Sequence, residues 1–66
     1  MRLYTVHELE AQLKAKGCLK TEEKSATATF WYTKNKVLFS VPAPDEHSGK
    51  YSDFVFYELR AFVEDN

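Results

Sequence analysis

An alternating aromatic segment, ATATFWYTKNKVLFSV at residues 26–41, constrains this chain more than any other stretch. Successive side chains of a β-strand point to opposite faces, so a period of two predicts two strands joined by a turn at Lys34-Asn35. A two-residue turn at that point also predicts which side chains share the face that forms the core. The pairs expected on that face are Tyr32 with Val37, Phe30 with Phe39, and Ala28 with Val41.

The other face of the predicted hairpin carries Trp31 and Leu38, with Thr29 and Ser40 beside them. Tryptophan is strongly enriched among the residues that dominate protein interfaces. A tryptophan on the outside of a sheet can also cover only a helix end or an edge, because single exposed apolar residues are common. Our hypothesis is that these four residues contact a protein partner or a second copy of the chain.

A chain of 66 residues is expected to form a single domain, 1–66, near the lower size at which proteins fold without metals or disulfides. Cys18 is the one cysteine, so no intramolecular disulfide can form and a cytoplasmic location is predicted. No apolar run approaches the roughly 20 residues of a membrane span. The first ten residues also carry acids where a signal peptide is apolar, so neither a leader nor a membrane segment is expected.

A helix is predicted over residues 6–16. Thr5 and Glu8 have the spacing of a capping box, in which each side chain accepts a hydrogen bond from the backbone amide of the other residue. Gly17 is expected to end the helix, because glycine readily adopts the left-handed conformation that closes many helices. The apolar residues between these two points recur with the helical period and form one stripe of Val6, Leu9 and Leu13.

Two patterns compete near the C-terminal end of the sequence. The stretch DFVFYEL is rich in Phe, Val and Tyr, and alone it would suit a strand. A helix over residues 53–64, capped by Ser52, accounts better for the apolar spacing. The apolar stripe of this helix is expected to consist of Tyr51, Val55, Leu59, Phe62 and Val63.

These elements predict an α+β fold. A short edge strand at Cys18 to Glu23 precedes the hairpin, and Pro42 and Pro44 end the hairpin before a loop over residues 42–50. The order is αβββα, a small antiparallel sheet with two helices packed on one face, because two apolar stripes and one apolar face bury each other most simply in this way. The opposite face of the sheet is expected to stay bare.

Lysines form a basic region although the net charge of the chain is only −1. Residues 14–36 hold six lysines against two glutamates, whereas residues 45–66 hold six acids against Lys50 and Arg60. Lysines spread over helix, loop and strand usually form a solvated surface. The alternative is a contact with RNA, for which the candidate residues are Lys14, Lys20, Lys24 and Lys36.

No catalytic or metal-binding constellation is recognisable. We interpret His7, in the first turn of the first predicted helix, as a surface residue. His47 follows Asp45 and Glu46 in a loop, where adjacent side chains seldom converge on one ion. Cys18 follows a helix C-terminus, which does not activate a thiol, so a buried structural role is predicted. We therefore predict no catalytic residue, no metal ligand and no cofactor.

Four features along residues 6–63 occur together in one known family. They are a helix that ends at Gly17 before Cys18-Leu19, a basic turn at Lys24-Ser25 leading into a strand, a strand that ends Ser40-Val41-Pro42, and a final helix. In these features the chain resembles the small HicA-type mRNA interferase toxins, whose fold is similar to a double-stranded-RNA-binding domain. That family carries a catalytic histidine in a Gly-Ser-His segment, where this chain has Lys24-Ser25-Ala26. The resemblance therefore implies the αβββα fold more directly than the nuclease activity.

Two functions follow as expectations. The first is a small non-enzymatic interaction module that binds a protein partner or itself through the exposed sheet face. The alternative is an RNA-binding or degenerate HicA-like mRNA interferase protein that uses the lysines. An enzyme with an unrecognised site ranks third.

Overall fold

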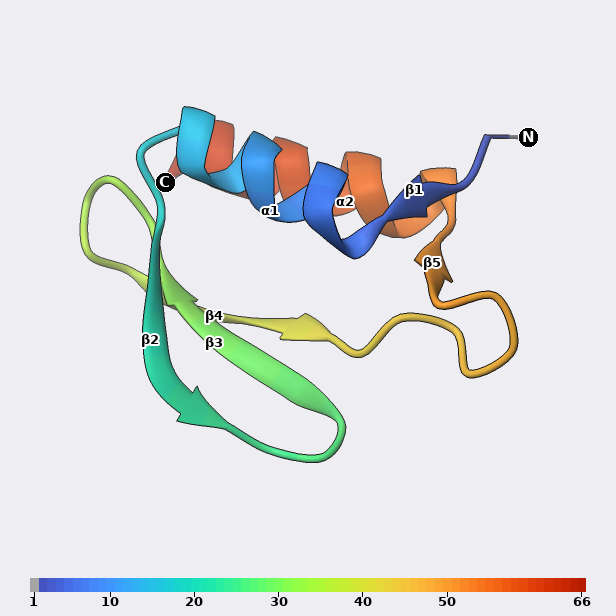
Figure 1. Ribbon diagram of the computed structural model, residues 1–66. Coiled ribbons are helices and arrows are strands. Elements are labelled where there is room, and N and C mark those ends of the chain that lie inside the picture. The colour runs from blue at the N-terminus through green and yellow to red at the C-terminus, as the bar shows by residue number, and fades with distance from the viewer. Residues whose placement is uncertain (1) are drawn as a thin grey trace.

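The computed structural model describes residues 2–66, which form two helices and two small sheets. Strands β2, β3 and β4 form an antiparallel sheet in that order, and β1 pairs with β5. Both helices lie side by side over one face of the three-stranded sheet (Figure 1), which confirms the predicted α+β fold with αβββα as its main order. The elements are β1 (Tyr4–Thr5), α1 (Val6–Ala15), β2 (Leu19–Lys24), β3 (Ala28–Tyr32), β4 (Leu38–Pro42), β5 (Lys50–Tyr51) and α2 (Asp53–Asp65).

Helix α1 begins and ends as its sequence predicts. The Glu8 amide donates to Thr5 Oγ1 at 3.1 Å and the Thr5 amide donates to Glu8 Oε1 at 3.2 Å, so the capping box is complete. Gly17 has a φ of 85°, and the Cys18 amide donates to the Leu13 carbonyl at 3.0 Å. This left-handed residue and its returning hydrogen bond close the helix and turn the chain toward β2.

Helix α2 confirms the helical reading of the C-terminal stretch, and most of the predicted apolar stripe packs against the core. Ser52 caps the helix, since its side chain accepts a hydrogen bond from the Val55 amide at 3.4 Å. Tyr51 and Val63 are buried, and Val55 and Leu59 pack against the core, as predicted. Phe62 is 37% exposed instead, and the buried Phe56 was not predicted. Phe56 stacks on the Tyr4 ring with the centroids 3.9 Å apart.

The short β1–β5 pair was not predicted. Tyr4 pairs with Tyr51, and the Tyr51 hydroxyl donates to the Pro42 carbonyl at 2.7 Å. Each strand directly precedes a helix or its cap, so this pairing brings the N-terminal ends of α1 and α2 together.

One core lies between the helices and the three-stranded sheet. The helices contribute Leu9, Leu13, Phe56 and Val63, and the sheet contributes Trp31, Phe39 and Val41. The buried face of the sheet is thus the one that the helices cover. Neither helix within residues 2–66 combines the length and the apolar character that crossing a membrane would require.

Candidate protein-binding surface

The turn between β3 and β4 has three residues, one more than predicted. The Thr33 amide donates to the Val37 carbonyl and the Lys36 amide donates to the Thr33 carbonyl, both at 2.9 Å. Lys36 has a φ of 65°, the left-handed residue that typically completes a three-residue hairpin loop. The buried Thr33 hydroxyl accepts from the Val37 amide at 3.1 Å and donates to the Asn66 carbonyl at 3.0 Å. The loop is therefore tied to the end of α2.

The additional turn residue shifts the register of the hairpin by one position. A shift of one residue exchanges the two faces of a strand, because side chains alternate. The predicted pairing across β3 and β4 is therefore wrong, while Phe39 and Val41 keep their predicted place in the core. The observed partners are Tyr32 with Leu38, Trp31 with Phe39, Phe30 with Ser40, and Thr29 with Val41.

Trp31 lies in the core, which corrects the hypothesis that its indole meets a partner. Its side chain is 0% exposed, and the indole Nε1 donates to Thr29 Oγ1 at 3.2 Å. Thr29 is only partly exposed and occupies the same, helix-covered face of β3. Trp31 and Thr29 therefore belong to the packing of the domain.

The bare sheet face instead presents an apolar row made of Leu19, Tyr32 and Leu38. Tyr32 pairs with Leu19 on one side and with Leu38 on the other, so the three side chains lie next to one another on the same face. They are 71%, 40% and 55% exposed respectively. Ser40 is exposed beside this row, and Phe30, opposite Ser40, is partly exposed. Leu38 and Ser40 thus lie on the bare face as predicted, while Leu19, Tyr32 and Phe30 were missed.

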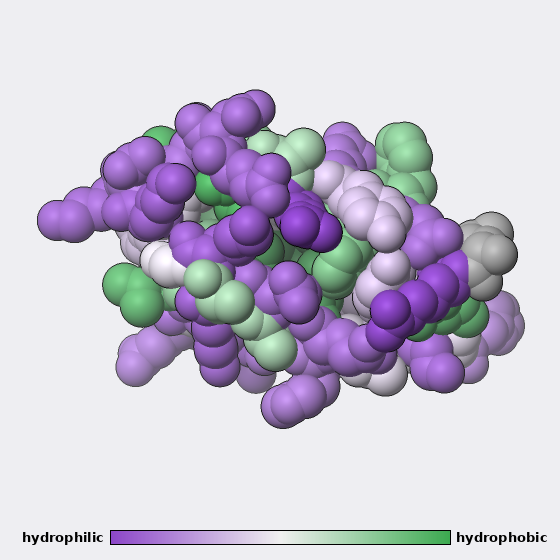
Figure 2. Space-filling model, turned by 90° about the horizontal axis from the view of Figure 1, so that it is seen from above, coloured by the Kyte–Doolittle hydropathy of each residue, from purple (hydrophilic) through white to green (hydrophobic). Residues whose placement is uncertain are grey.

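The two faces of the molecule differ in character. Figure 2 shows the side that carries the helices, where hydrophilic side chains cover most of the surface and apolar ones emerge between them. The apolar row lies on the face that the helices leave uncovered. Large exposed apolar side chains in one contiguous row are a common mark of an interaction site.

A groove runs along the outer edge of β4. Its volume is about 360 Å³, and we call it the β4–α2 groove because these two elements supply its walls. The rings of Phe39 and Phe62 lie 5.5 Å apart at its base. The lining residues are Phe39, Ser40, Pro42, Val55, Glu58, Leu59 and Phe62.

The four candidate RNA-binding lysines do not form one patch. Lys20 Nζ lies 2.9 Å from Glu10 Oε2, so its charge is paired. Lys24 is at the far end of β2, whereas Lys36 belongs to the hairpin loop beside the start of that strand. Lys14 is exposed on α1, which covers the opposite face of the sheet. The structure therefore brings Lys36 near the apolar row and leaves the other three elsewhere.

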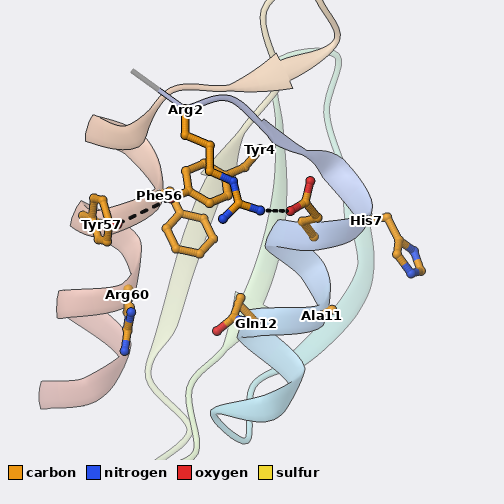
Figure 3. A pocket seen from close by; sticks show the side chains of 9 residues that line it. Arg2, Tyr4, His7, Ala11, Gln12, Phe56, Tyr57 and Arg60 are labelled. Atoms are coloured by element: carbon orange, nitrogen blue, oxygen red, sulfur yellow. Dashed lines mark hydrogen bonds and ion pairs between the residues drawn. The ribbon is translucent and has the colours of Figure 1, made fainter.

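A polar pocket of about 390 Å³ lies between α1 and α2 (Figure 3). The Arg2 guanidinium pairs with the Glu8 carboxylate at 2.8 Å and lies over the Tyr4 ring, 4.7 Å from its centroid. The Tyr4 hydroxyl donates to the Tyr57 hydroxyl at 3.4 Å. This hydrogen bond, followed by desolvation, raises the pKa of Tyr4 to about 12. His7 also lines the pocket, and its side chain is exposed.

Cys18 and Asp45 are two further titratable groups with shifted pKa values. Burial raises the pKa of the Cys18 thiol, which keeps it protonated in the core. Asp45 accepts hydrogen bonds from the amides of Ser48 and His47 at 2.9 and 3.1 Å, and these bonds, that from Ser48 foremost, lower its pKa. Within residues 2–66, no three His, Cys, Asp or Glu side chains are placed to hold a metal ion.

The segment Lys24-Ser25-Ala26 forms the turn between β2 and β3. The Ser25 hydroxyl accepts from the amides of Thr27 and Ala28 at 3.3 and 3.2 Å, so it shapes the turn. A cavity of about 260 Å³ lies beside this turn, and no histidine of the described residues 2–66 lines it. The serine that resembles the interferase motif therefore has no imidazole in that cavity.

Comparisons with models of protein families, with curated proteins and with solved structures gave no match.

Proposed function

We propose that this chain is a small non-enzymatic module that binds a protein partner through the bare sheet face. The observation that supports it is the apolar row, three adjacent side chains from three strands that no part of residues 2–66 covers. Tyr32, in the middle of the row, is of a residue type enriched in interface hot spots. Leu19 and Leu38 flank it and would exclude water from its contact with a partner.

The size of this face favours a different protein over a second copy of the chain. A standard interface takes about 800 Å² from each partner, which is about a sixth of the chain's accessible surface of 4723 Å². Three strands about 4.8 Å apart and about five residues long present a face of only about 240 Å² in plan. Two such faces laid together would bury too little, even if side-chain relief doubled that area. The partner is therefore one that also covers surface beside the sheet face.

The test compares variants of the row with a matched control. In a Leu19→Lys/Leu38→Lys variant two exposed apolar side chains become charged, and a partner that covers the row then has to desolvate two charges. Phe54→Lys makes the same change at a side chain that is 76% exposed on α2. The measurement is quantitative affinity purification of wild type and both variants after nuclease treatment. A protein retained by wild type and Phe54→Lys and lost with the double variant supports the proposal.

Two results would refute this proposal. One is a double variant that retains the same proteins as wild type, with its fold verified by thermal unfolding. The other is a wild type that retains no protein once nucleic acid is removed.

A second candidate function is an RNA contact, which one observation favours. Tyr32, Lys34 and Lys36 line a common hollow of about 480 Å³, so an aromatic ring and two lysines lie together. Bases stack on aromatic side chains and phosphates pair with lysines in sequence-tolerant binding of single strands. Such binding weakens steeply with salt, whereas binding through the apolar row does not. Titration of a fluorescent oligonucleotide at rising salt, with wild type and Lys34→Glu/Lys36→Glu, distinguishes the two.

A further inference from the structure

The outer edge of β4 is unpaired in residues 2–66. Strand order β2-β3-β4 leaves β4 with a neighbour on one side alone. An edge strand with free backbone groups is a template on which another extended segment can form hydrogen bonds.

The hydrogen-bond pattern identifies which backbone groups point outward. Bonds from the Thr33 amide to the Val37 carbonyl and from the Ala43 amide to the Thr27 carbonyl bracket the hairpin ladder. In antiparallel strands, pairs joined by backbone hydrogen bonds alternate with pairs that are not. Leu38 and Ser40 belong to pairs without these bonds, so their amides and carbonyls point away from β3. Pro42, the next residue in this outward series, has no amide, and its carbonyl already accepts from the Tyr51 hydroxyl. The available edge is therefore short and centred on Ser40.

The β4–α2 groove lies along this same edge. A strand added to β4 would direct every second side chain into the groove, against the rings of Phe39 and Phe62. Its remaining side chains would lie next to Leu38 on the bare face and extend the apolar row. One occupant would therefore cover both the edge and part of the exposed face.

The charge of the groove indicates the chemistry of this occupant. Glu58 is the one charged residue among those that line it, and within residues 2–66 it forms no ion pair. A segment with lysine or arginine close to its apolar side chains would complement this carboxylate. A second copy of β4 could not occupy the groove. Its inward side chains, Phe39 and Val41, are buried in its own core and are not free to fill the groove of another copy.

We infer that the partner contributes an extended, basic segment with alternating apolar residues, which adds to the sheet at β4 and fills the β4–α2 groove. This inference rests on the proposed function, since the segment belongs to the protein that covers the apolar row. The backbone of Leu38 and Ser40 supplies hydrogen bonds, the groove selects apolar side chains, and Glu58 selects the basic ones.

The experiment uses a capped synthetic peptide in which valine alternates with lysine and threonine, and a matched peptide with glutamate in place of lysine. Binding is followed by NMR shifts and hydrogen exchange of the backbone amides. We expect the lysine peptide to bind, to slow exchange at the amides of Leu38 and Ser40, and to bind at least about tenfold more tightly than the glutamate peptide.

Two pairs of variants make the test specific. Ser40→Pro removes the outward amide, and proline is tolerated at an edge where that group faces solvent; Ser40→Ala keeps the amide as its control. We expect about a tenfold or greater loss of binding for the proline variant and none for alanine. Glu58→Lys should reverse the preference between the two peptides, whereas Glu58→Gln should abolish it. If Ser40→Pro does not fold, the same loss is measured with wild type and a peptide N-methylated at alternate amides.

The inference is overturned if neither peptide binds at about 1 mM, or if proline and alanine variants bind equally. When that happens and the double variant of Leu19 and Leu38 still loses its protein partner, only the strand addition fails. When the double variant keeps every partner as well, the proposed function fails with it.

Discussion

Trp31 lies directly opposite Phe39 in the β3–β4 ladder, one position away from where a two-residue turn would place it. This one-residue shift in register originates in the turn, where Lys36 adopts a φ of 65° and adds a third residue. That single backbone conformation buries the indole and places Tyr32 on the bare face between Leu19 and Leu38. The proposed interaction surface depends on this turn.

The conformation of Lys36 predicts a stabilising substitution. Lysine is strained at positive φ and glycine is not, so Lys36→Gly should raise the free energy of unfolding by about 1 kcal/mol. Lys34→Gly in the same loop serves as the control and should not stabilise the protein. The measurement is urea unfolding followed by tryptophan fluorescence. A lower unfolding midpoint for Lys36→Gly would contradict the observed turn.

Trp31 is predicted to matter for stability. Trp31→Ala leaves a large cavity among fully buried side chains and should cost about 3–5 kcal/mol, which is a large part of the stability of a small domain. Leu38→Ala on the bare face should change the free energy of unfolding by less than about 0.5 kcal/mol. Circular dichroism during thermal unfolding measures both. A Trp31→Ala variant as stable as wild type would refute the assignment of Trp31 to the core.

Much of the fold could be predicted from local chemistry. The Thr5 and Glu8 spacing, the glycine at position 17 and the cap at Ser52 each act within a few residues, so they defined both helices. The register of the hairpin could not be predicted, because nothing in Lys34-Asn35-Lys36 indicates that the third residue takes the left-handed conformation. Since β4 keeps its faces under this shift and β3 exchanges them, Leu38 and Ser40 were placed correctly and Trp31 and Thr29 were not.

The missed members of the apolar row carry only weak signals. Tyr32 has a hydroxyl that suits a solvent-facing position. The alternation in a strand, however, does not indicate which of its two sets of alternate side chains faces solvent. Leu19 stands next to the buried Cys18, and either residue satisfied the pattern of a half-buried edge strand. The β1–β5 pair is two residues long on each side, below the length at which a period can be recognised.

Glu8 predicts a pH dependence of stability. Hydrogen bonding from the Thr5 amide, followed by its hydroxyl and the Arg2 charge, lowers the pKa of Glu8 below its ordinary value of 4.5. A lowered folded-state pKa stabilises the protein above the unfolded value, so this contribution is complete above about pH 4.5 and is lost as the pH falls through the folded pKa. Glu8→Gln keeps an acceptor for the cap and removes the charge. Between pH 6 and pH 3 the urea unfolding midpoint should fall less steeply for Glu8→Gln than for wild type. An equal slope for both proteins would contradict a stabilising contribution from the Glu8 carboxylate.

Cys18 is predicted to react slowly in the folded protein. Cys18 is only 3% exposed, and burial raises the pKa of its thiol. A thiol reagent at neutral pH therefore finds little reactive thiolate. The rate of labelling should rise with urea in parallel with unfolding. Fast labelling of the native protein would contradict the burial of Cys18 between α1 and β2.

The most direct test of the account is the exposure of the hairpin side chains, measured by NMR with a soluble nitroxide. The bare face carries Leu19, Tyr32 and Leu38, so their side-chain signals should broaden strongly, while the indole signal of Trp31 should stay sharp. An indole that broadens while the ring of Tyr32 is protected would place the hairpin in the other register and remove the proposed binding surface.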